Sequence, residues 1–265
     1  MTEEIPNRSG DAFTTDDESQ ILNAIDKWLD KEVKDKVLAL DHADEYPIQM
    51  VEQMKSLGLF GATISQKYGG LGMPSASYAK VVTAVSEVWM SLSGIFNSHL
   101  IMAAAVERFG TEDQKQRFLP KFATGEIRGG LALTEPSCGT DLQAIRTKAH
   151  KEGDHYLING SKTWISNGIE GDCVALLVKT DTEIQPRHKG MSLFLAEKGP
   201  GFSVGPKLEK LGYKGIDSAE LFFDNYVIAA DNLIGGEEGH GFHHTVGGLE
   251  LGRINVAARG VGVAN

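Results

Sequence analysis

The fold and the function of this chain are best approached from the stretch LALTEPSCGTD, residues 131–141, which begins as an apolar strand and continues as a polar loop. The loop places backbone N–H groups and hydroxyls beside an apolar wall. Gly139 lets a ligand approach the backbone, and the Thr140 hydroxyl can donate to an anion. These features suit a planar, hydrogen-bonding ring that carries phosphates. A plain turn whose side chains cap the local backbone has the same composition, so both interpretations stay open.

A second informative stretch is KTWISNG, residues 162–168. Trp164 and Ser166 should lie on one side of a strand that ends in an Asn-Gly turn. An indole beside a hydroxyl could stack on a cofactor ring and hydrogen-bond to it. The alternative is a tryptophan that is simply part of the core.

The region around these two stretches is rich in short β-type runs. They are separated by turn residues such as Asn159-Gly160, and no ten-residue helical pattern lies between them. We therefore expect an antiparallel sheet, forming a small barrel or sandwich. No GxGxxG motif follows a strand, so a Rossmann unit is not indicated. The expected strands are TKAH, HYLI, CVALLVK, MSLFLA and AELFF.

Helical patterns flank this β-region on both sides. After it, apolar residues recur at three- and four-residue steps among many Gly and Ala, which predicts close helix contacts. The fold class is thus α+β, with an all-α N-terminal domain, an antiparallel β-barrel or sandwich in the middle and the start of a C-terminal helical bundle. The predicted division is a disordered lead-in (1–17), a helical domain (18–128), a β-domain (129–236) and a helix in which the chain stops (237–265). The first predicted helix begins at Asp16, after a Thr15/Glu18 capping box. Further helices are predicted at Pro47–Gly58, Tyr78–Trp89 and Ile101–Phe109, followed by a second capping box at Thr111–Gln114.

Composition excludes several classes of function. The 265 residues include 26 basic and 36 acidic side chains, a net charge of −10, which argues against binding to nucleic-acid phosphates. Cys138 and Cys173 lack the spacing of a zinc site or a disulfide framework. We find no apolar run of the roughly 20 residues needed to span a bilayer, and no signal or transit pattern in MTEEIPNRSG, so we expect a cytoplasmic protein.

Five separated stretches of the chain resemble the acyl-CoA dehydrogenase family. LTEPSCGTD resembles that family's flavin signature, and TWISNG resembles its second flavin segment. RFGTEDQKQRFLPKFATGE is similar to the helix that precedes them. LGLFGATISQKYGGLG is similar to the N-terminal substrate-side segment, and LELGRINVAARGVGVAN to the first helix of the C-terminal domain. The resemblance extends from about Ser19 to Asn265.

The resemblance implies a helical, a β and a second helical domain, with FAD in the crevice between them and across a subunit contact. It implies α,β-dehydrogenation of an acyl-CoA thioester, with electrons leaving through an electron-transfer flavoprotein. It also implies a homo-oligomer, either a tetramer or a dimer.

The same resemblance assigns roles to individual residues. The flavin would contact the end of the first strand, the following loop and the TWIS segment. The acyl-CoA would contact that loop and the last helix, where Glu250 and Arg253 could instead form an i, i+3 ion pair. The implied cofactor-binding residues are Leu131, Leu133, Thr134, Gly139, Thr140, Trp164, Ile165 and Ser166, and the implied substrate-binding residues are Thr140, Glu250 and Arg253.

No catalytic base is identified in this sequence. The usual glutamate belongs to the part of the C-terminal domain beyond the last helix, and in a branched-chain subset the base directly precedes the arginine of LELGR, where Gly252 stands here. Glu250 would face away from that position, and Glu135 is better interpreted as structural. We therefore expect these residues alone to be inactive. Two alternatives remain: a flavin monooxygenase or oxidase on the same fold, or a truncated, non-catalytic homologue that binds flavin or a partner.

Three histidines fall within five residues, at positions 240, 243 and 244. Such a group suggests a metal site, but no further ligand accompanies it in the sequence. We therefore favour a solvated helix entrance and predict no metal.

Overall fold

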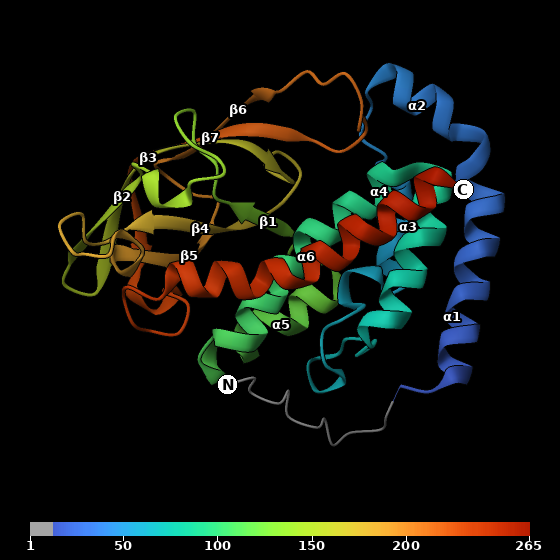
Figure 1. Ribbon diagram of the computed structural model, residues 1–265, viewed down its shortest axis with the longest axis horizontal. Helices are drawn as coiled ribbons and strands as arrows, with labels where there is room; N and C mark the ends of the chain where they lie inside the picture. Colours follow the sequence, from blue (N-terminus) through green and yellow to red (C-terminus); the bar gives the residue numbers. More distant parts are fainter. Residues whose placement is uncertain (1–12) are drawn as a thin grey trace.

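The computed structural model describes residues 13–265, which form a helical part, a β-sheet and a long final helix (Figure 1). The elements follow the predicted succession of helices, strands and helix, although how the chain divides into domains stays a prediction. The helices are α1 (Thr15–Trp28), α2 (Val37–Ala43), α3 (Ile48–Ser56), α4 (Ser75–Phe109), α5 (Glu112–Thr124) and α6 (Gly241–Ala264). The strands are β1 (Gly129–Ala132), β2 (Lys148–Glu152), β3 (His155–Ser166), β4 (Cys173–Lys179), β5 (Met191–Glu197), β6 (Phe202–Lys207) and β7 (Ser218–Ala229).

Helix α1 begins one residue earlier than the sequence predicted. The Thr14 hydroxyl accepts from the Asp17 amide at 3.1 Å, and the Asp17 carboxylate accepts from the Thr14 amide at 2.8 Å. The capping box is therefore Thr14/Asp17, because Glu18 instead accepts hydrogen bonds from Ser77 and Lys80 on α4. The predicted disordered lead-in is wrong for residues 15–17, and its first twelve residues lie outside those described.

Helix α4 consists of two helical stretches that meet at a kink at Trp89, whose φ of −158° and ψ of 104° are not helical. The first predicted helix ends at this kink, as the sequence predicted, but the second stretch begins well before Ile101. The small and polar residues between the two predicted helices broke the apolar periodicity, yet most of them are buried. By length and composition alone α4 could cross a membrane, but 78% of its apolar window is buried inside the protein, as in a core helix.

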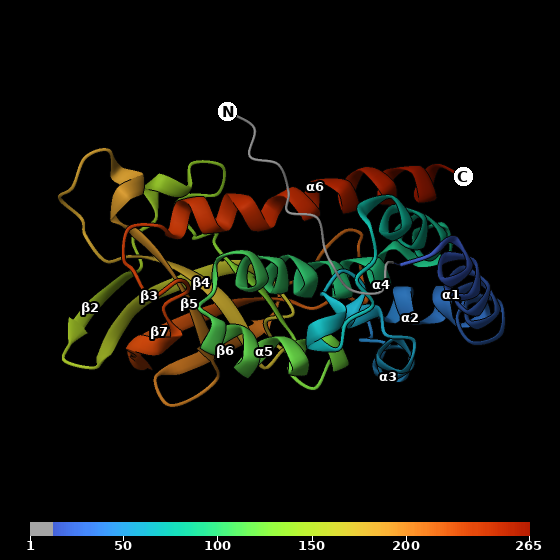
Figure 2. The ribbon, with the colours of Figure 1, turned by 90° about the horizontal axis from the view of Figure 1, so that it is seen from below.

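Helix α6 runs antiparallel along α4, and glycines let the two backbones approach (Figure 2). A Cβ on Gly262 would lie 2.3 Å from the Thr83 carbonyl oxygen, and a Cβ on Gly248 would lie 3.0 Å from the Ile101 carbonyl oxygen. These contacts agree with the close packing that the Gly- and Ala-rich sequence predicted.

The sheet is mixed, which corrects the prediction that it is purely antiparallel. Its order is β1-β4-β2-β3-β7-β6, with β5 also paired to β4, and it curls on itself (Figure 1). Strand β1 runs parallel to β4, with Gly129 opposite Cys173. The β2–β3 hairpin between them reverses the direction of the chain, so β4 can run parallel to β1 without a crossover helix.

Strand β3 continues through Asn159-Gly160, where the sequence predicted a turn. The pairing with β7 shifts register between Ile158 and Gly160, so the dipeptide forms an irregularity inside a long strand. Gly160 has φ 147°, and a Cβ there would lie 2.5 Å from the Thr147 hydroxyl oxygen. Strand β6 was not predicted, because Gly205 and Pro206 interrupt its pattern.

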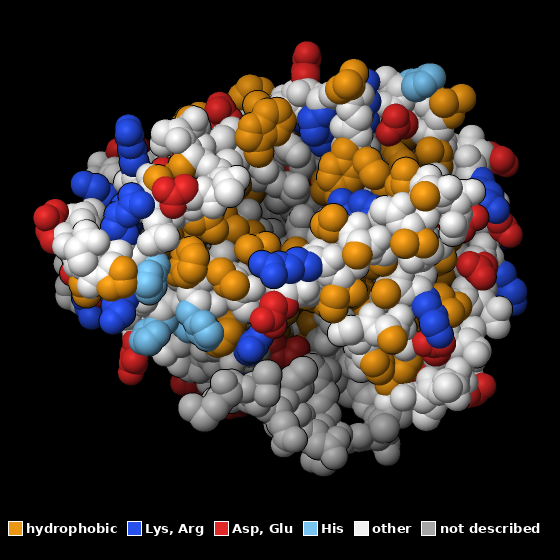
Figure 3. Space-filling model, in the orientation of Figure 1, with side chains coloured by type: hydrophobic (Ala, Val, Ile, Leu, Met, Phe, Trp, Pro, Cys, Tyr) orange, Lys and Arg blue, Asp and Glu red, His pale blue; other side chains and the backbone are white. Residues whose placement is uncertain are grey.

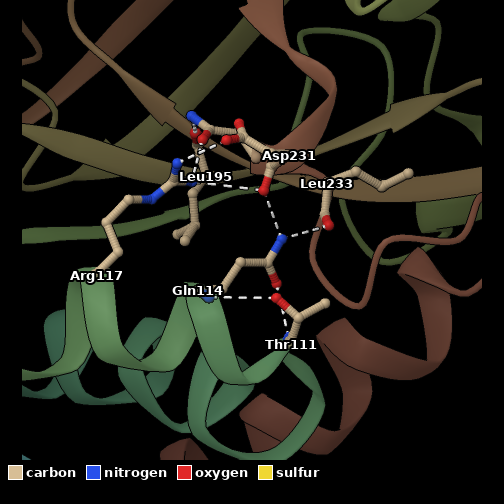
Figure 4. A network of polar contacts seen from close by, with 7 residues as sticks. Thr111, Gln114, Arg117, Leu195, Asp231 and Leu233 are labelled. Carbon is tan, nitrogen blue, oxygen red and sulfur yellow. Dashed lines mark hydrogen bonds and ion pairs between the residues drawn. The ribbon is translucent and has the colours of Figure 1, made fainter.

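Helix α5 is tied to the segment that follows β7 through one buried glutamine (Figure 4). The side-chain amide nitrogen of Gln114 donates to the carbonyl oxygens of Asp231 and Leu233, each at 2.7 Å. Its oxygen accepts from the amides of Thr111 at 3.0 Å and Gly235 at 3.2 Å. The Thr111/Gln114 capping box predicted from the sequence is confirmed, and the same glutamine also joins two parts of the fold.

Replacing Gln114 with Ala should lower the free energy of unfolding by about 2–4 kcal/mol, because buried carbonyl and amide groups lose their partners. Urea unfolding measures this change. Gln116→Ala is the matched control, since exposed Gln116 bonds only to Glu112 on the same helix, and it should cost less than about 0.5 kcal/mol. Equal effects of the two substitutions would contradict a joining role for Gln114.

Candidate functional site

The two informative stretches of sequence meet where β1 ends. The Thr163 amide donates to the Thr134 carbonyl oxygen at 2.9 Å. A tight turn then reverses the chain, because the amides and carbonyls of Glu135 and Cys138 bond to each other at 2.9 and 3.1 Å. The end of β1 and the second half of β3 therefore form one wall.

A buried ion pair between Lys162 and Glu135 stabilises this wall. The Lys162 ammonium lies 2.8 Å from the Glu135 carboxylate, and these side chains are 0% and 4% exposed. Lys162 also donates to the Leu133 carbonyl oxygen at 3.1 Å. The carboxylate accepts from the amides of Arg146 and Thr147, at 2.6 and 3.0 Å. The pair thus joins β1, β3 and the chain entering β2.

Each member of this pair has a shifted pKa. Burial lowers the pKa of Lys162 to about 8, against the opposing effect of Glu135. Burial alone would raise the pKa of Glu135, but the Lys162 charge and the backbone amides hold it below its ordinary value. Glu135 is therefore a fully engaged carboxylate, consistent with a structural role.

Trp164 has an unusual backbone conformation and an exposed side chain within strand β3. Its φ is 59°, in the left-handed region, and the register with β7 shifts between Lys162 and Ile165. Its side chain is 55% exposed, so the core alternative for this indole is wrong. A bulky residue in this strained conformation with an exposed ring is a pointer to function.

The hydroxyls of Thr134 and Ser166 lie on the same wall. Neither hydroxyl takes part in a hydrogen bond among residues 13–265, so both are available to a ligand. Leu131 and Leu133 are half-buried and contribute apolar surface. The Ile165 side chain, in contrast, points into the sheet core, which leaves only its backbone for a ligand.

Gly139 and Thr140 lie on the exposed loop beyond this wall. A Cβ on Gly139 would meet only the Thr134 methyl group, at 3.7 Å. The loop is therefore open, and no other element covers Gly139 within the described chain, while its role in binding a ligand stays a prediction.

Asn167 fastens the wall to helix α4. Its side-chain nitrogen donates to the carbonyl oxygens of Ile95 and Gly129, at 2.9 and 2.8 Å. The sequence suggested only a turn residue here, and nothing local indicated this role. Figure 3 shows the surface hollowed between the strands and α6, with hydrophobic side chains in the wall and Lys or Arg side chains at the rim.

The predicted substrate residues on α6 lie on its outer side. Glu250 forms an ion pair with Arg108 of α4 at 2.7 Å, so the suggested pair with Arg253 does not form. Arg253 is exposed. Gly252 faces α4, where a Cβ would lie 2.6 Å from the Ile101 Cδ1 atom.

Of the three histidines at the start of α6, His240 and His243 are exposed and only His244 is buried. His244 is buried and stacks on Phe109 with ring centroids 4.6 Å apart. Burial, together with the charges of His240 and His243, lowers its pKa to about 4. Among residues 13–265, no three His, Cys, Asp or Glu side chains are placed to hold a metal ion.

The chain matches known proteins over nearly its full length. Residues 15–126 match the acyl-CoA dehydrogenase N-terminal domain, and residues 130–226 match the middle domain. The chain is 38% identical over 227 residues to (2S)-methylsuccinyl-CoA dehydrogenase of Cereibacter sphaeroides, covering 82% of this chain and 41% of that protein. It is 36% identical over 252 residues to an acyl-CoA dehydrogenase of Bacillus subtilis, covering 94% and 66%. It therefore spans 41–66% of the length of these curated relatives.

The fold agrees with this match. The solved butyryl-CoA dehydrogenase from Megasphaera elsdenii superposes with a TM-score of 0.90 at 33% identity, over 96% of this chain and 67% of that one. The resemblance found in the sequence is confirmed.

Substituting Met for Lys162 should destabilise the protein by about 3–5 kcal/mol, because the buried Glu135 charge loses its partner. The double variant Lys162→Met/Glu135→Gln should cost no more than the single one, since it leaves no unpaired charge. Urea unfolding of both variants tests this coupling. Lys36→Met, which removes the exposed pair with Glu32, is the control and should cost under about 1 kcal/mol. Additive losses in the double variant would refute the coupling.

Proposed function

Since this chain belongs to the acyl-CoA dehydrogenase family, we propose that it is part of an FAD-dependent enzyme that introduces an α,β double bond into an acyl-CoA thioester. The observation that carries the proposal is the wall formed by Thr134, Ser166 and Trp164. It offers two unpaired hydroxyls and an exposed, strained indole beside apolar surface. A flat ring with polar edges and a hydrophobic face matches that arrangement.

The residues present fit a flavin. FAD, when bound, supplies the acceptor for the hydride that leaves the β-carbon. Thr134 and Ser166 would hydrogen-bond the polar edge of the ring, and Trp164 would pack against it. Gly139 and Thr140 would approach the phosphates or the substrate through the open loop. The ion pair of Lys162 and Glu135 holds these groups in place before any ligand binds.

The base that takes the α-proton is not found among the described residues near this wall. Gly252 carries no side chain, Glu250 is paired with Arg108 on the surface, and Glu135 is held by Lys162. A general base must reach the proton it removes and must not already be committed to a cation. We therefore propose that the base lies outside these residues and that they turn over substrate poorly by themselves.

Two alternatives make different predictions at the same site. In a flavin oxidase or monooxygenase, reduced flavin would react rapidly with oxygen, whereas a dehydrogenase holding its product suppresses that reaction. In a non-catalytic homologue, flavin would bind without being reduced by acyl-CoA. The lack of an available base near the wall within residues 13–265 supports this last alternative.

The remaining proposals concern partners and location. We propose an electron-transfer flavoprotein as the electron acceptor, a homotetramer or homodimer as the assembly and the cytoplasm as the compartment. They are supported by the family and, for the compartment, by the composition of the sequence.

Replacing Trp164 with Ala should weaken FAD binding by about 1–3 kcal/mol, because the stacking surface is lost. A fluorescence titration of the reconstituted protein with FAD measures the affinity. Phe222→Ala, which removes an exposed aromatic ring from the outer side of β7, should leave FAD affinity unchanged. Undiminished flavin affinity of the Trp164→Ala variant would contradict the assignment of this wall as the flavin site.

The flavin-loaded protein should be tested anaerobically against a panel of acyl-CoA thioesters. Because we propose that the base lies outside these residues, stoichiometric substrate is expected to bleach the flavin absorbance only slowly, and slow reoxidation by air should follow. Bleaching followed by fast reoxidation would favour an oxidase. A flavin that no thioester reduces would favour a non-catalytic protein.

A further inference from the structure

Arg259 on α6 is a half-buried guanidinium that lacks an acidic partner. Its Nη1 donates to the Tyr213 hydroxyl and its Nη2 to the Asn255 side-chain oxygen, both at 2.6 Å. Its Nε is buried and has no hydrogen-bond partner. None of the ion pairs within residues 13–265 includes Arg259. A positive charge held in this way is unusual, because desolvated charges are ordinarily paired.

Tyr213 adds a second unused donor at the same place. Its hydroxyl accepts from Arg259, but the hydroxyl proton has no acceptor among the hydrogen bonds of the described chain. Burial raises the pKa of this phenol, against the effect of Arg259, so the proton is retained at neutral pH. Its ring centroid lies 5.0 Å from the guanidinium carbon.

Tyr213 is held at this place in an unfavourable backbone conformation. Its φ is 59°, in the left-handed region. Its hydroxyl reaches so far into the helix pair that a Cβ on Gly94 of α4 would lie 1.6 Å from it. Asn255, wholly buried, accepts from Arg259 and donates to the Tyr78 hydroxyl at 2.9 Å. The donors are thus positioned by three separate segments.

This cluster adjoins the candidate site. Gly94, which the Tyr213 hydroxyl touches, directly precedes Ile95, whose carbonyl oxygen accepts from Asn167. Asn167 in turn directly follows Ser166 on the site wall. The cluster therefore lies on the α4–α6 side of the same part of the molecule.

We propose that Arg259 and Tyr213 form a subsite for a carboxylate at the distal end of the acyl group. The substrate class is then a CoA thioester of a dicarboxylic acid, bound through its free carboxylate. This inference rests on the proposed function and narrows it. A carboxylate would supply acceptors to the Nε and the phenol proton and would neutralise the guanidinium, whereas an alkyl end would leave these donors unpaired.

The inference is tested by comparing two thioesters of similar length, glutaryl-CoA and pentanoyl-CoA, with the flavin-loaded chain. Calorimetric titration should give at least about tenfold tighter binding of glutaryl-CoA, the scale of one charge-assisted hydrogen bond. The neutral amide analogue of glutaryl-CoA should bind like pentanoyl-CoA. Equal or tighter binding of pentanoyl-CoA by the unmodified protein overturns the inference without any variant.

Arg259→Gln should remove the preference for glutaryl-CoA while leaving pentanoyl-CoA affinity within about twofold. Arg146→Gln, at an exposed arginine whose side chain makes no ion pair, should keep the preference and controls for net charge. If Arg259→Gln fails to fold, Tyr213→Phe should still reduce the preference several-fold. A preference that survives both substitutions overturns the proposed subsite.

Failure of the inference and failure of the proposed function give different results. Flavin bleaching by pentanoyl-CoA with no preference for glutaryl-CoA would retain the dehydrogenase and refute the subsite. Absence of binding and of bleaching with every thioester would refute both.

Discussion

The buried contact between Lys162 and Glu135 is the interaction on which the candidate site depends. One ammonium group holds the carboxylate and the Leu133 carbonyl oxygen, and the carboxylate holds the amides of Arg146 and Thr147. Because both charges are removed from water, neither can be lost without leaving the other unpaired. The loop after β1 is thereby fixed against β3, and the hydroxyls of Thr134 and Ser166 are placed without a ligand.

A second constraint is the close packing of α4 against α6. Glycines on α6 allow it, and it brings α6 beside the segment of α4 to which Asn167 attaches the sheet. The same packing encloses Arg259 with Tyr213. A single pair of helices therefore supports the proposed flavin wall on one side and bears the proposed carboxylate subsite on the other, so both proposals depend on the packing of the fold.

The sequence predicted much of this structure, and its failures have physical causes. Helix caps and strand runs were found because they depend on neighbouring residues, as in the Thr111/Gln114 box. The parallel β1–β4 pair and the buried helical residues between Trp89 and Ile101 depend on distant partners and were missed. The same applies to the Lys162 pair, to Asn167 and to Arg259, whose roles come from contacts between segments far apart in the chain. The left-handed backbone of Trp164 had no local signal, since no glycine or asparagine marks it.

The most direct test of the central claim is hydrogen–deuterium exchange of the purified chain with and without FAD. If the two segments form one preformed flavin wall, the amides of residues 131–135 and 162–167 should gain protection together, while residues 150–156 of the β2–β3 hairpin stay unchanged. Protection that is absent, or that is confined to only one of the two segments, would contradict the account.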